Sequence, residues 1–372
     1  MMRELLTNGI LRRILADTDV ILGVNPQFGL VTVNGRRYVI GIWEQKFKRL
    51  MPLGDLLDET QLRGTGATLW TADVYRRYLQ ACKSSGARFG SFLAKLHSGA
   101  IHQTVLECFP ELKAGSPSHS ATYRDPMMEF ITVSDEKVLR RFREDTAADS
   151  GLWLPLGRVA KCLLRKNELV EQCVAMHGCT PSSFRVAAFG DILQQPDQTQ
   201  PATVDVDGPI WKFNMSSRGI TGNMVQLLAH LLVTLFLHRH CPGPFKSGTE
   251  EFIDQLLENY ADRSEVVAKV RRAIELKCRK HPVWHVVQST VERFGAEIIL
   301  NVVGQQSDNH YFEYQATRVM LSEQRELVRL GTWYMDRAGR SVKDMLEWRN
   351  WEEFRREEHM IMLRLFRISP GR

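Results

Sequence analysis

The run MVQLLAHLLVTLFL at residues 224–237 places the strongest constraint on how this chain folds, because a long apolar stretch must be removed from water. It is shorter than the roughly 20 residues with which a helix spans a bilayer. Gln226, His230 and Thr234 recur every four residues in it, which draws one polar stripe along an otherwise apolar helix. The pattern predicts a helix at the centre of a protein core and no association with a membrane.

Helical periodicity dominates the chain after residue 70. Apolar residues return every three or four positions in segments 71–83, 134–142, 155–176, 250–260, 264–278, 282–295 and 340–366. Thr71, Ser134, Thr249 and Ser264 each precede a first turn that contains Asp or Glu, as helix N-caps commonly do. The sequence therefore predicts a mainly α protein.

A small β element near the N-terminus is the exception. The segment LVTVNGRRYVIGIW at 30–43 joins two β-branched runs through Asn34-Gly35, a pair that tolerates the positive φ angles of a type I′ turn. A length of 372 residues favours two lobes. We expect them at 1–200 and 201–372, with the Pro-, Gln- and Asp-rich stretch 194–209 near the boundary.

Composition favours an intracellular protein. The seven cysteines are odd in number and have no framework spacing, which is typical of reduced thiols. The start MMRELLTNGILRRIL is interrupted by charge and differs from a signal peptide. We expect the cytoplasm or nucleus, or a virion if the source is viral.

Basic residues carry the clearest functional signal. Arginine outnumbers lysine 35 to 14, and its planar guanidinium group suits phosphate and stacks on bases. Three windows are poor in acidic residues: 60–106, which contains only Asp73, 150–167 and 208–249. They are called the first, second and third acid-poor windows below.

Acid-poor windows are typical of polyanion-binding surfaces, because nearby carboxylates oppose phosphate binding. In the first window Phe89 is a candidate for stacking on a base. The alternative is that the windows are solvated helix faces whose acidic partners lie elsewhere in the sequence. The candidate nucleic-acid-binding residues are Arg63, Arg76, Arg77, Arg88, Phe89, Arg158, Lys161, Arg165, Lys166, Arg218 and Arg239.

A nuclease site is the main catalytic alternative. Asp197, Asp205 and Asp207 precede Lys212, and clustered carboxylates before a lysine can hold Mg²⁺ and activate water. However, in PD-(D/E)xK nucleases the last acid and the lysine are separated by one residue, which is not the spacing here. A solvated turn explains the segment better.

Metal and cofactor signatures are also weak. Cys173, His177 and Cys179 lie close together, and 238–241 offers further ligand types, but the paired Cys-x₂-Cys spacing of zinc sites is missing. The sequence contains no phosphate-binding or dinucleotide-binding glycine loop and no nucleophile elbow. We expect no metal, no cofactor and no catalysis.

A bilobal, mainly helical chain of this size with distributed arginines resembles the nucleoproteins of negative-strand RNA viruses, in layout and without a matched motif. The resemblance implies two helical lobes that clamp the RNA backbone in a basic groove, and arms that reach neighbouring subunits. It leads us to expect a sequence-nonspecific RNA-binding, self-associating nucleoprotein that coats or packages viral RNA. Its partners would be single-stranded RNA, further copies of itself, and a polymerase or another protein.

Two other functions stay open. One is a helical adaptor or scaffold subunit whose basic surface binds an acidic protein. The other is the metal-dependent nuclease considered above. Salt-dependent RNA binding, protein binding alone and Mg²⁺-dependent cleavage distinguish the three.

The C-terminal segment is the candidate for self-association. Trp348, Trp351 and Phe354 recur every three residues and are followed by the apolar run MIMLRLF, and aromatic anchors are typical of protein interfaces. The segment either packs on its own lobe or docks on a neighbouring copy. We expect an exchange arm at 341–372, so that its deletion would give a folded monomer.

Overall fold

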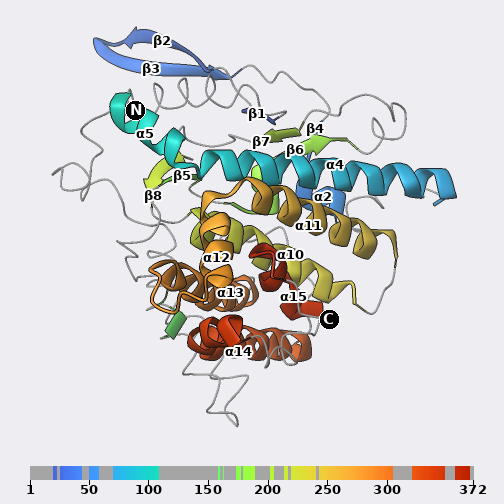
Figure 1. The fold of residues 1–372 in the computed structure, drawn as a ribbon. Coiled ribbons are helices and arrows are strands. Elements are labelled where there is room, and N and C mark those ends of the chain that lie inside the picture. Colours follow the sequence, from blue (N-terminus) through green and yellow to red (C-terminus); the bar gives the residue numbers. More distant parts are fainter. Residues whose placement is uncertain are drawn as a thin grey trace.

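The fold is known from a computed structural model. It describes residues 20–22, 26–43, 50–57, 70–108, 158–159, 162, 173–176, 179–188, 202–204, 213–216, 219–239, 243–304, 321–347 and 357–368. Within these residues helices predominate, so the prediction of a mainly α protein is confirmed. The helices are α2 (Leu53–Leu57), α4 (Ala72–Leu96), α5 (Gly99–Cys108), α10 (Val225–Leu237), α11 (Pro244–Arg263), α12 (Glu265–Glu275), α13 (Val283–Gly304), α14 (Leu321–Glu347) and α15 (Glu357–Leu365) (Figure 1).

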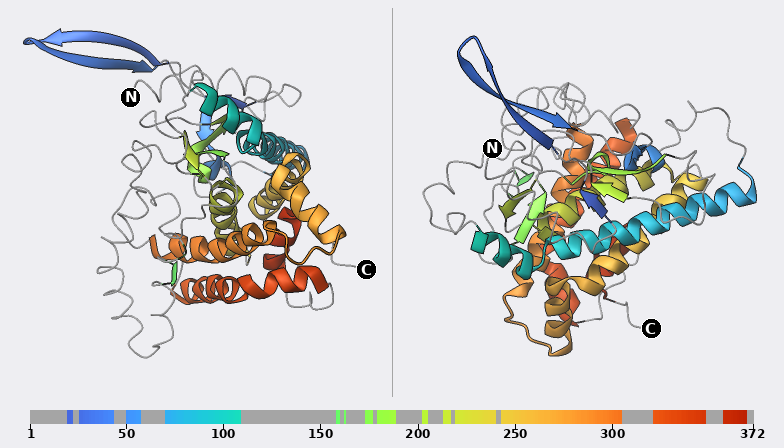
Figure 2. Two further views of the ribbon diagram at one scale, coloured as in Figure 1. Left: turned by 60° about the vertical axis from the view of Figure 1, so that its left-hand side comes forward. Right: turned by 90° about the horizontal axis from the view of Figure 1, so that it is seen from above.

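The predicted hairpin is also confirmed. β2 (Pro26–Val33) and β3 (Arg36–Trp43) pair antiparallel along their whole length. Asn34 and Gly35 join them with φ angles of 51° and 75°, the left-handed backbone that the type I′ turn requires. Figures 1 and 2 show the hairpin extending away from the helices.

Among the described residues, six further short strands, in two sheets, were not predicted. β1 (Val20–Leu22), β7 (Ala202–Val204), β6 (Phe184–Ala187) and β4 (Leu50–Pro52) form a four-stranded sheet in that order. β5 (Cys173–Met176) pairs with β8 (Phe213–Ser216). The predicted helix at 155–176 is therefore wrong at its C-terminal end. All four residues of β5 are buried, and a short continuous apolar run fits a helix or a strand equally well.

The apolar run at 224–237 forms α10, as predicted. Almost all of its side chains are buried, including His230 and Thr234 on the polar stripe. A π-helix, η5 (Gly219–Met224), leads directly into α10. Together they are long and apolar enough to cross a membrane, but 83% of the most apolar 18-residue stretch is buried inside the protein, as expected of a core helix.

Two of the predicted N-caps are confirmed. Thr71 and Ser264 precede α4 and α12, and each side chain accepts a hydrogen bond from the third residue of the following helix. The N-cap at Thr249 is wrong, because α11 begins five residues earlier at Pro244. The buried Thr249 hydroxyl instead donates to the carbonyl oxygen of Phe245 within the helix. Ser134 lies outside the described residues.

α4 and α11 form the most extensive helix–helix contact in the described part of the chain, and they run parallel (Figure 1). Tyr78 on α4 lies against Gly248 on α11, and His97 at the end of α4 lies against Tyr260. Between these points a Cβ atom at Gly86 or Gly90 would overlap the carbonyl oxygens of Phe252 and Leu256 on α11. The two glycines therefore let the helix backbones approach closely. This contact also crosses the lobe boundary expected near residue 200, and that division stays a prediction.

α13 and α14 repeat this close packing in an antiparallel pair, which Figure 2 shows side by side. Gly295 and Gly331 face each other, and a Cβ atom on either would overlap the carbonyl oxygen of the other. The rings of Phe294 and Tyr334 meet edge to face beside the glycines, with centroids 4.9 Å apart. In both helix pairs, glycines that lie against backbone carbonyl groups thus allow the close spacing.

The apolar end of the C-terminal segment lies in the core of its own chain. Leu363, Leu365 and Phe366 are fully buried, and α15 packs on α11. Arg364 and Arg367 form ion pairs with Asp254 and Asp262 of α11. The expectation that the run MIMLRLF docks on a neighbouring copy is therefore wrong for residues 360–366, and its deletion would remove part of the core. Trp348, Trp351 and Phe354 lie outside the described residues.

We expect Gly90→Ala to lower the free energy of unfolding by about 1–3 kcal/mol, because the added methyl group cannot be accommodated beside the Leu256 carbonyl. Urea unfolding measures the change. The matched control is Gly339→Ala on α14, where the nearest atom to an added Cβ is 3.8 Å away. There the higher helix propensity of alanine should raise stability by up to about 1 kcal/mol. Equal effects at both positions would contradict the close approach of α4 and α11.

Candidate nucleic-acid interface

The first and third acid-poor windows meet where α4 and α11 begin. The Trp70 ring lies 5.6 Å from the Phe245 ring, and Tyr78 contacts both, at 5.3 and 5.8 Å. His238, at the end of α10, stacks on Phe245 at 6.3 Å. These four residues, Trp70, Tyr78, Phe245 and His238, are called the aromatic corner.

Only part of the aromatic corner reaches the surface. Tyr78 and Phe245 are buried, and the Tyr78 hydroxyl donates to the carbonyl oxygen of Leu56. Trp70 and His238 are half-buried. The buried rings of Tyr78 and Phe245 thus support the rings of Trp70 and His238, which a ligand can contact.

Both helices present their N-terminal ends at the aromatic corner, because they run parallel. A helix N-terminus carries a partial positive charge and N–H groups without intrahelical partners, which together favour anions. The side chain of Thr71 caps α4. Gly243 precedes α11 and gives no side-chain cap, and the first turn of α11 contains no acidic residue.

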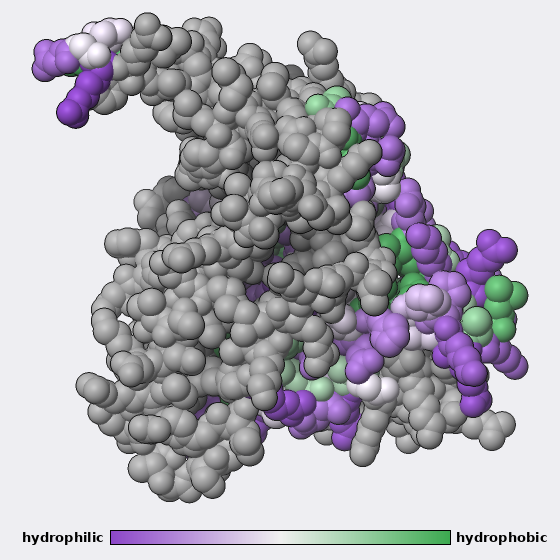
Figure 3. Space-filling model, turned by 90° about the vertical axis from the view of Figure 1, so that its left-hand side faces the viewer, coloured by the Kyte–Doolittle hydropathy of each residue, from purple (hydrophilic) through white to green (hydrophobic). Residues whose placement is uncertain are grey.

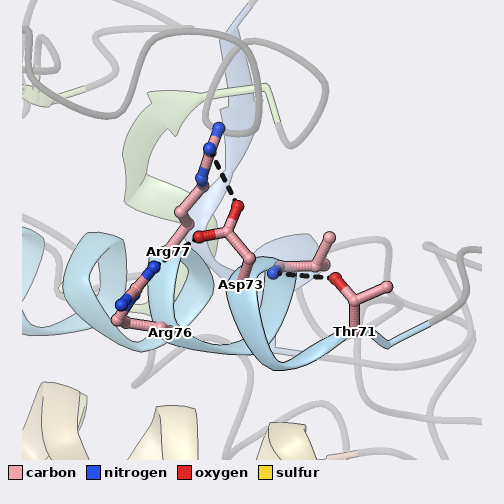
Figure 4. Close-up of polar contacts among 5 residues, drawn as sticks. Thr71, Asp73, Arg76 and Arg77 are labelled. Atoms are coloured by element: carbon pink, nitrogen blue, oxygen red, sulfur yellow. Dashed lines mark hydrogen bonds and ion pairs between the residues drawn. The ribbon is translucent and has the colours of Figure 1, made fainter.

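Arg76 and Arg77 lie on the first turns of α4 and share one carboxylate (Figure 4). Their guanidinium nitrogens are 2.6 and 2.8 Å from the oxygens of Asp73. The hydrogen bond from Arg76 lowers the pKa of Asp73 most, so this carboxylate stays charged near neutral pH. Two cations against one anion leave a net positive charge, and exposed pairs of this kind exchange readily for phosphate since each stabilises by only about 0–1 kcal/mol.

Arg239 lies at the end of α10, next to His238. Its guanidinium carbon is 3.7 Å from the centre of the Phe236 ring, and one nitrogen is 2.9 Å from a Glu326 oxygen on α14. The side chain is 28% exposed. Stacking on Phe236 orients the guanidinium group, as a ligand-binding arginine requires.

The remaining predicted residues have different positions. Arg158, in the second window, is exposed and paired with Asp336 of α14, and Arg88 is half-buried on α4.

Phe89 is fully buried, with its ring 4.4 Å from Phe184. The expectation that Phe89 stacks on a base is therefore wrong, because the helical period turns it into the core. Arg63, Lys161, Arg165, Lys166 and Arg218 are outside the part of the chain that the structure describes.

Sequence reasoning did not select Trp70 and His238 as candidate residues. Each lies in an acid-poor window, and His238 directly precedes a predicted arginine. Aromatic residues beside basic ones are the signal that would have found them. Their contact through Phe245 depends on the parallel packing of α4 and α11, which the sequence does not reveal.

A buried polar cluster lies at the opposite end of the α4–α11 pair. His97 Nδ1 is 3.0 Å from the Tyr260 hydroxyl, and His97 Nε2 is 3.1 Å from Asn223 Oδ1. Asn223, in the π-helix η5, also accepts from the backbone N–H of Met176 and donates to its carbonyl oxygen, both at 2.7 Å. The cluster therefore ties β5 to the ends of both helices.

These partners fix the charge and tautomer of His97. Asn223 Oδ1 only accepts, so His97 Nε2 carries the hydrogen, and the Tyr260 hydroxyl donates to Nδ1. Burial lowers the pKa of His97 to about 4, against a smaller opposing effect of the bond to Asn223. His97, Asn223 and Tyr260 are all buried, so the cluster holds the fold together and is not a binding surface.

Comparison with known proteins identifies no relative: neither a family model nor a curated sequence matches the chain. Among the described residues no group of three or more His, Cys, Asp or Glu side chains is arranged to hold a metal ion.

We expect stability to fall as the pH drops from about 6.5 towards 4. In this range the unfolded chain takes up a proton at His97 that the folded protein does not, which costs about 3 kcal/mol in total. Above pH 6.5 both states are neutral at this residue, and the contribution is constant. Urea unfolding at pH 7 and pH 4.5 measures the effect.

The control is His97→Gln, which does not titrate. The variant should be less stable at pH 7 but should lose less stability on acidification than the wild type. His102, whose pKa burial also lowers, is present in both proteins and cancels in the comparison. An identical pH dependence in the two proteins would contradict the assignment.

Proposed function

We propose that the protein binds single-stranded RNA without sequence preference and associates with further copies of itself, as a nucleoprotein does. The observation that carries the proposal is the meeting of two acid-poor windows at the aromatic corner. Arginines, half-exposed rings and two helix N-termini lie together there. Basic groups that neutralise phosphates beside rings that stack on bases are the combination with which proteins hold single strands.

The chemistry of the aromatic corner favours a single strand over a duplex. Trp70 and His238 are ring systems whose contact with bases requires unpaired nucleotides. Arg76 is the most accessible of its cations, with 79% of its side chain exposed. Arg77 and Arg239 are partly buried and held by neighbours, which orients them before a ligand binds.

Self-association rests on the sequence alone. Trp348, Trp351 and Phe354 remain the candidates for contacts between copies, and the coating or packaging of viral RNA stays part of the proposal. A polymerase or another protein remains a further candidate partner.

Binding of fluorescently labelled single-stranded RNA of mixed sequence, measured by anisotropy at increasing salt, tests the proposal. Log affinity should fall linearly with log salt, by about 0.7 for each phosphate contact, and equally for unrelated sequences. Duplex RNA and single-stranded DNA serve as comparisons. Absence of salt-dependent binding to every nucleic acid would overturn the proposed function, and exclusive binding to an acidic protein would favour an adaptor instead.

Two variants at the start of α4, beside the aromatic corner, should change RNA affinity in opposite directions. Replacing Arg76 and Arg77 with Ala should reduce the salt slope by about 1.4 and weaken binding to all sequences alike. Asp73→Asn should strengthen binding, because it frees both guanidinium groups from their carboxylate. Because the asparagine side chain has nearly the same shape as aspartate, this substitution changes the packing at the start of α4 very little. If neither variant changes RNA affinity, α4 does not contact the RNA.

A further inference from the structure

One stretch of the chain concentrates nearly all of its net positive charge. Residues 269–280 read KVRRAIELKCRK and contain six basic residues and one acidic residue, a net charge of +5, whereas the whole chain carries +6. The stretch covers most of α12 and the turn that leads to α13. Glu275 interrupts it, so it is not an acid-free window.

α12 exposes its basic side chains along one side. Val266, Val267, Val270 and Ala273 are buried against the protein. Lys269, Arg271, Arg272 and Leu276 are exposed on the opposite side, where residues 269, 272 and 276 fall on one line of the helix. Figure 3 shows the face of the molecule that lies on the left in Figure 1, where hydrophilic side chains of the described residues are interspersed with hydrophobic patches.

Five cations of α12 and its turn have no carboxylate partner among the described residues. Lys269, Arg271, Arg272, Lys277 and Lys280 are exposed, and none forms an ion pair with any part of the chain that the structure describes. The set of these five residues is called the α12 basic surface.

The two neighbouring carboxylates are not placed to neutralise it. Glu265 lies against the start of α5, since its Oε2 would be 3.4 Å from a Cβ atom on Gly99. Glu275 follows Arg271 by four residues, and a base that precedes an acid at this spacing is the less favourable order for pairing on a helix. The charges of the surface are therefore available to a ligand.

The turn that carries Lys277 and Lys280 is held by several hydrogen bonds. α12 ends in a Schellman motif, in which the N–H of Lys277 bonds to the Ile274 carbonyl and the N–H of Cys278 to the Ala273 carbonyl, both at 2.9 Å. The indole N–H of Trp284 then donates to the Cys278 carbonyl at 2.7 Å. A ligand that binds here meets backbone that is already ordered, which reduces the entropy lost on binding.

Lys277 occupies a position that normally favours glycine. Its φ angle is 48°, in the left-handed region. α15 ends in the same motif with Arg367 at the equivalent position, where φ is 52°. The charge of Arg367 is paired with Asp262 of the same chain. Lys277 has no such partner in the part of the chain that the structure describes, so no contact there explains a charged side chain at this position.

We propose that the α12 basic surface binds the phosphate backbone of single-stranded RNA, as a second site separate from the aromatic corner. The identity of the polyanion rests on the proposed function. The two sites lie at opposite ends of α11, whose 20 residues span roughly 30 Å. One strand of several nucleotides is therefore needed to contact both.

The composition of the surface favours RNA over an acidic protein. Three of its five residues are lysines, which are depleted in protein–protein interfaces, and it contains no aromatic anchor. Leu276 is the large apolar residue exposed beside it, with 68% of its surface accessible. The closely spaced cations of the α12 basic surface fit a regular series of phosphates and make no base-specific contacts.

The test measures RNA affinity against salt for Lys269→Gln/Arg272→Gln in the full chain. Loss of two phosphate contacts should reduce the salt slope by about 1.4, which corresponds to roughly 25-fold weaker binding at 0.1 M salt if affinities converge at 1 M. The matched control, Arg36→Gln/Arg329→Gln, removes two other exposed arginines from β3 and α14 and should leave the slope unchanged.

Lys277→Gly separates binding from folding. Glycine adopts the left-handed conformation without strain, so the thermal midpoint should not fall, while the slope should decrease by about 0.7. Unchanged RNA binding by both α12 variants, with weaker binding by the Arg76/Arg77 variant, would overturn this inference and leave the proposed function standing. If the wild type binds no nucleic acid, both fail. Binding of polyglutamate and not RNA through Lys269 and Arg272 would overturn the inference in favour of a protein partner.

Discussion

The rest of the structure depends on the close approach of α4 and α11. Gly86 and Gly90 lie against backbone carbonyl groups of α11, so no larger side chain fits between the two helices. Because the register is parallel, everything at one end of α4 meets the corresponding end of α11. Trp70 thereby contacts Phe245 at the start, and His97 contacts Tyr260 at the finish. The aromatic corner and the buried polar cluster are thus two consequences of one packing contact.

The polar cluster shows how the short strands are attached to the helices. Asn223 pairs with both backbone groups of Met176, much as a neighbouring strand would. It occupies the π-helix η5, a rare helical form. Only the neutral His97 ring can accept from Tyr260 at Nδ1, and burial disfavours the charged ring, so acid weakens the junction between β5 and the helices.

The sequence predicts the helices well and their contacts poorly. Apolar periodicity and capping residues located α4, α10 and α12, and the Asn34-Gly35 pair located the hairpin, because these signals are local. β5 was misjudged since a four-residue buried strand has no distinctive period. Phe89 was assigned to the surface although the helical period buries it. The glycine contacts that set the α4–α11 register depend on residues about 160 positions apart, and no pattern along a single chain reports them.

The order of acidic and basic residues along a helix explains why acid-poor windows are an incomplete guide to basic surfaces. Asp73 is the single acid in the first window, yet it precedes Arg76 and Arg77 by three and four residues, the favourable order for pairing on a helix, and it binds both. Glu275 excluded the stretch 269–280 from such a window, yet it follows the arginines of α12, in the unfavourable order, and binds neither Arg271 nor Arg272. An acid in the favourable order pairs with its basic neighbours and competes with phosphate for them, whereas an acid in the unfavourable order leaves its neighbours without that competition. The order and spacing of charges on a helix, rather than their count in a window, therefore decide which cations have a carboxylate partner that phosphate must displace.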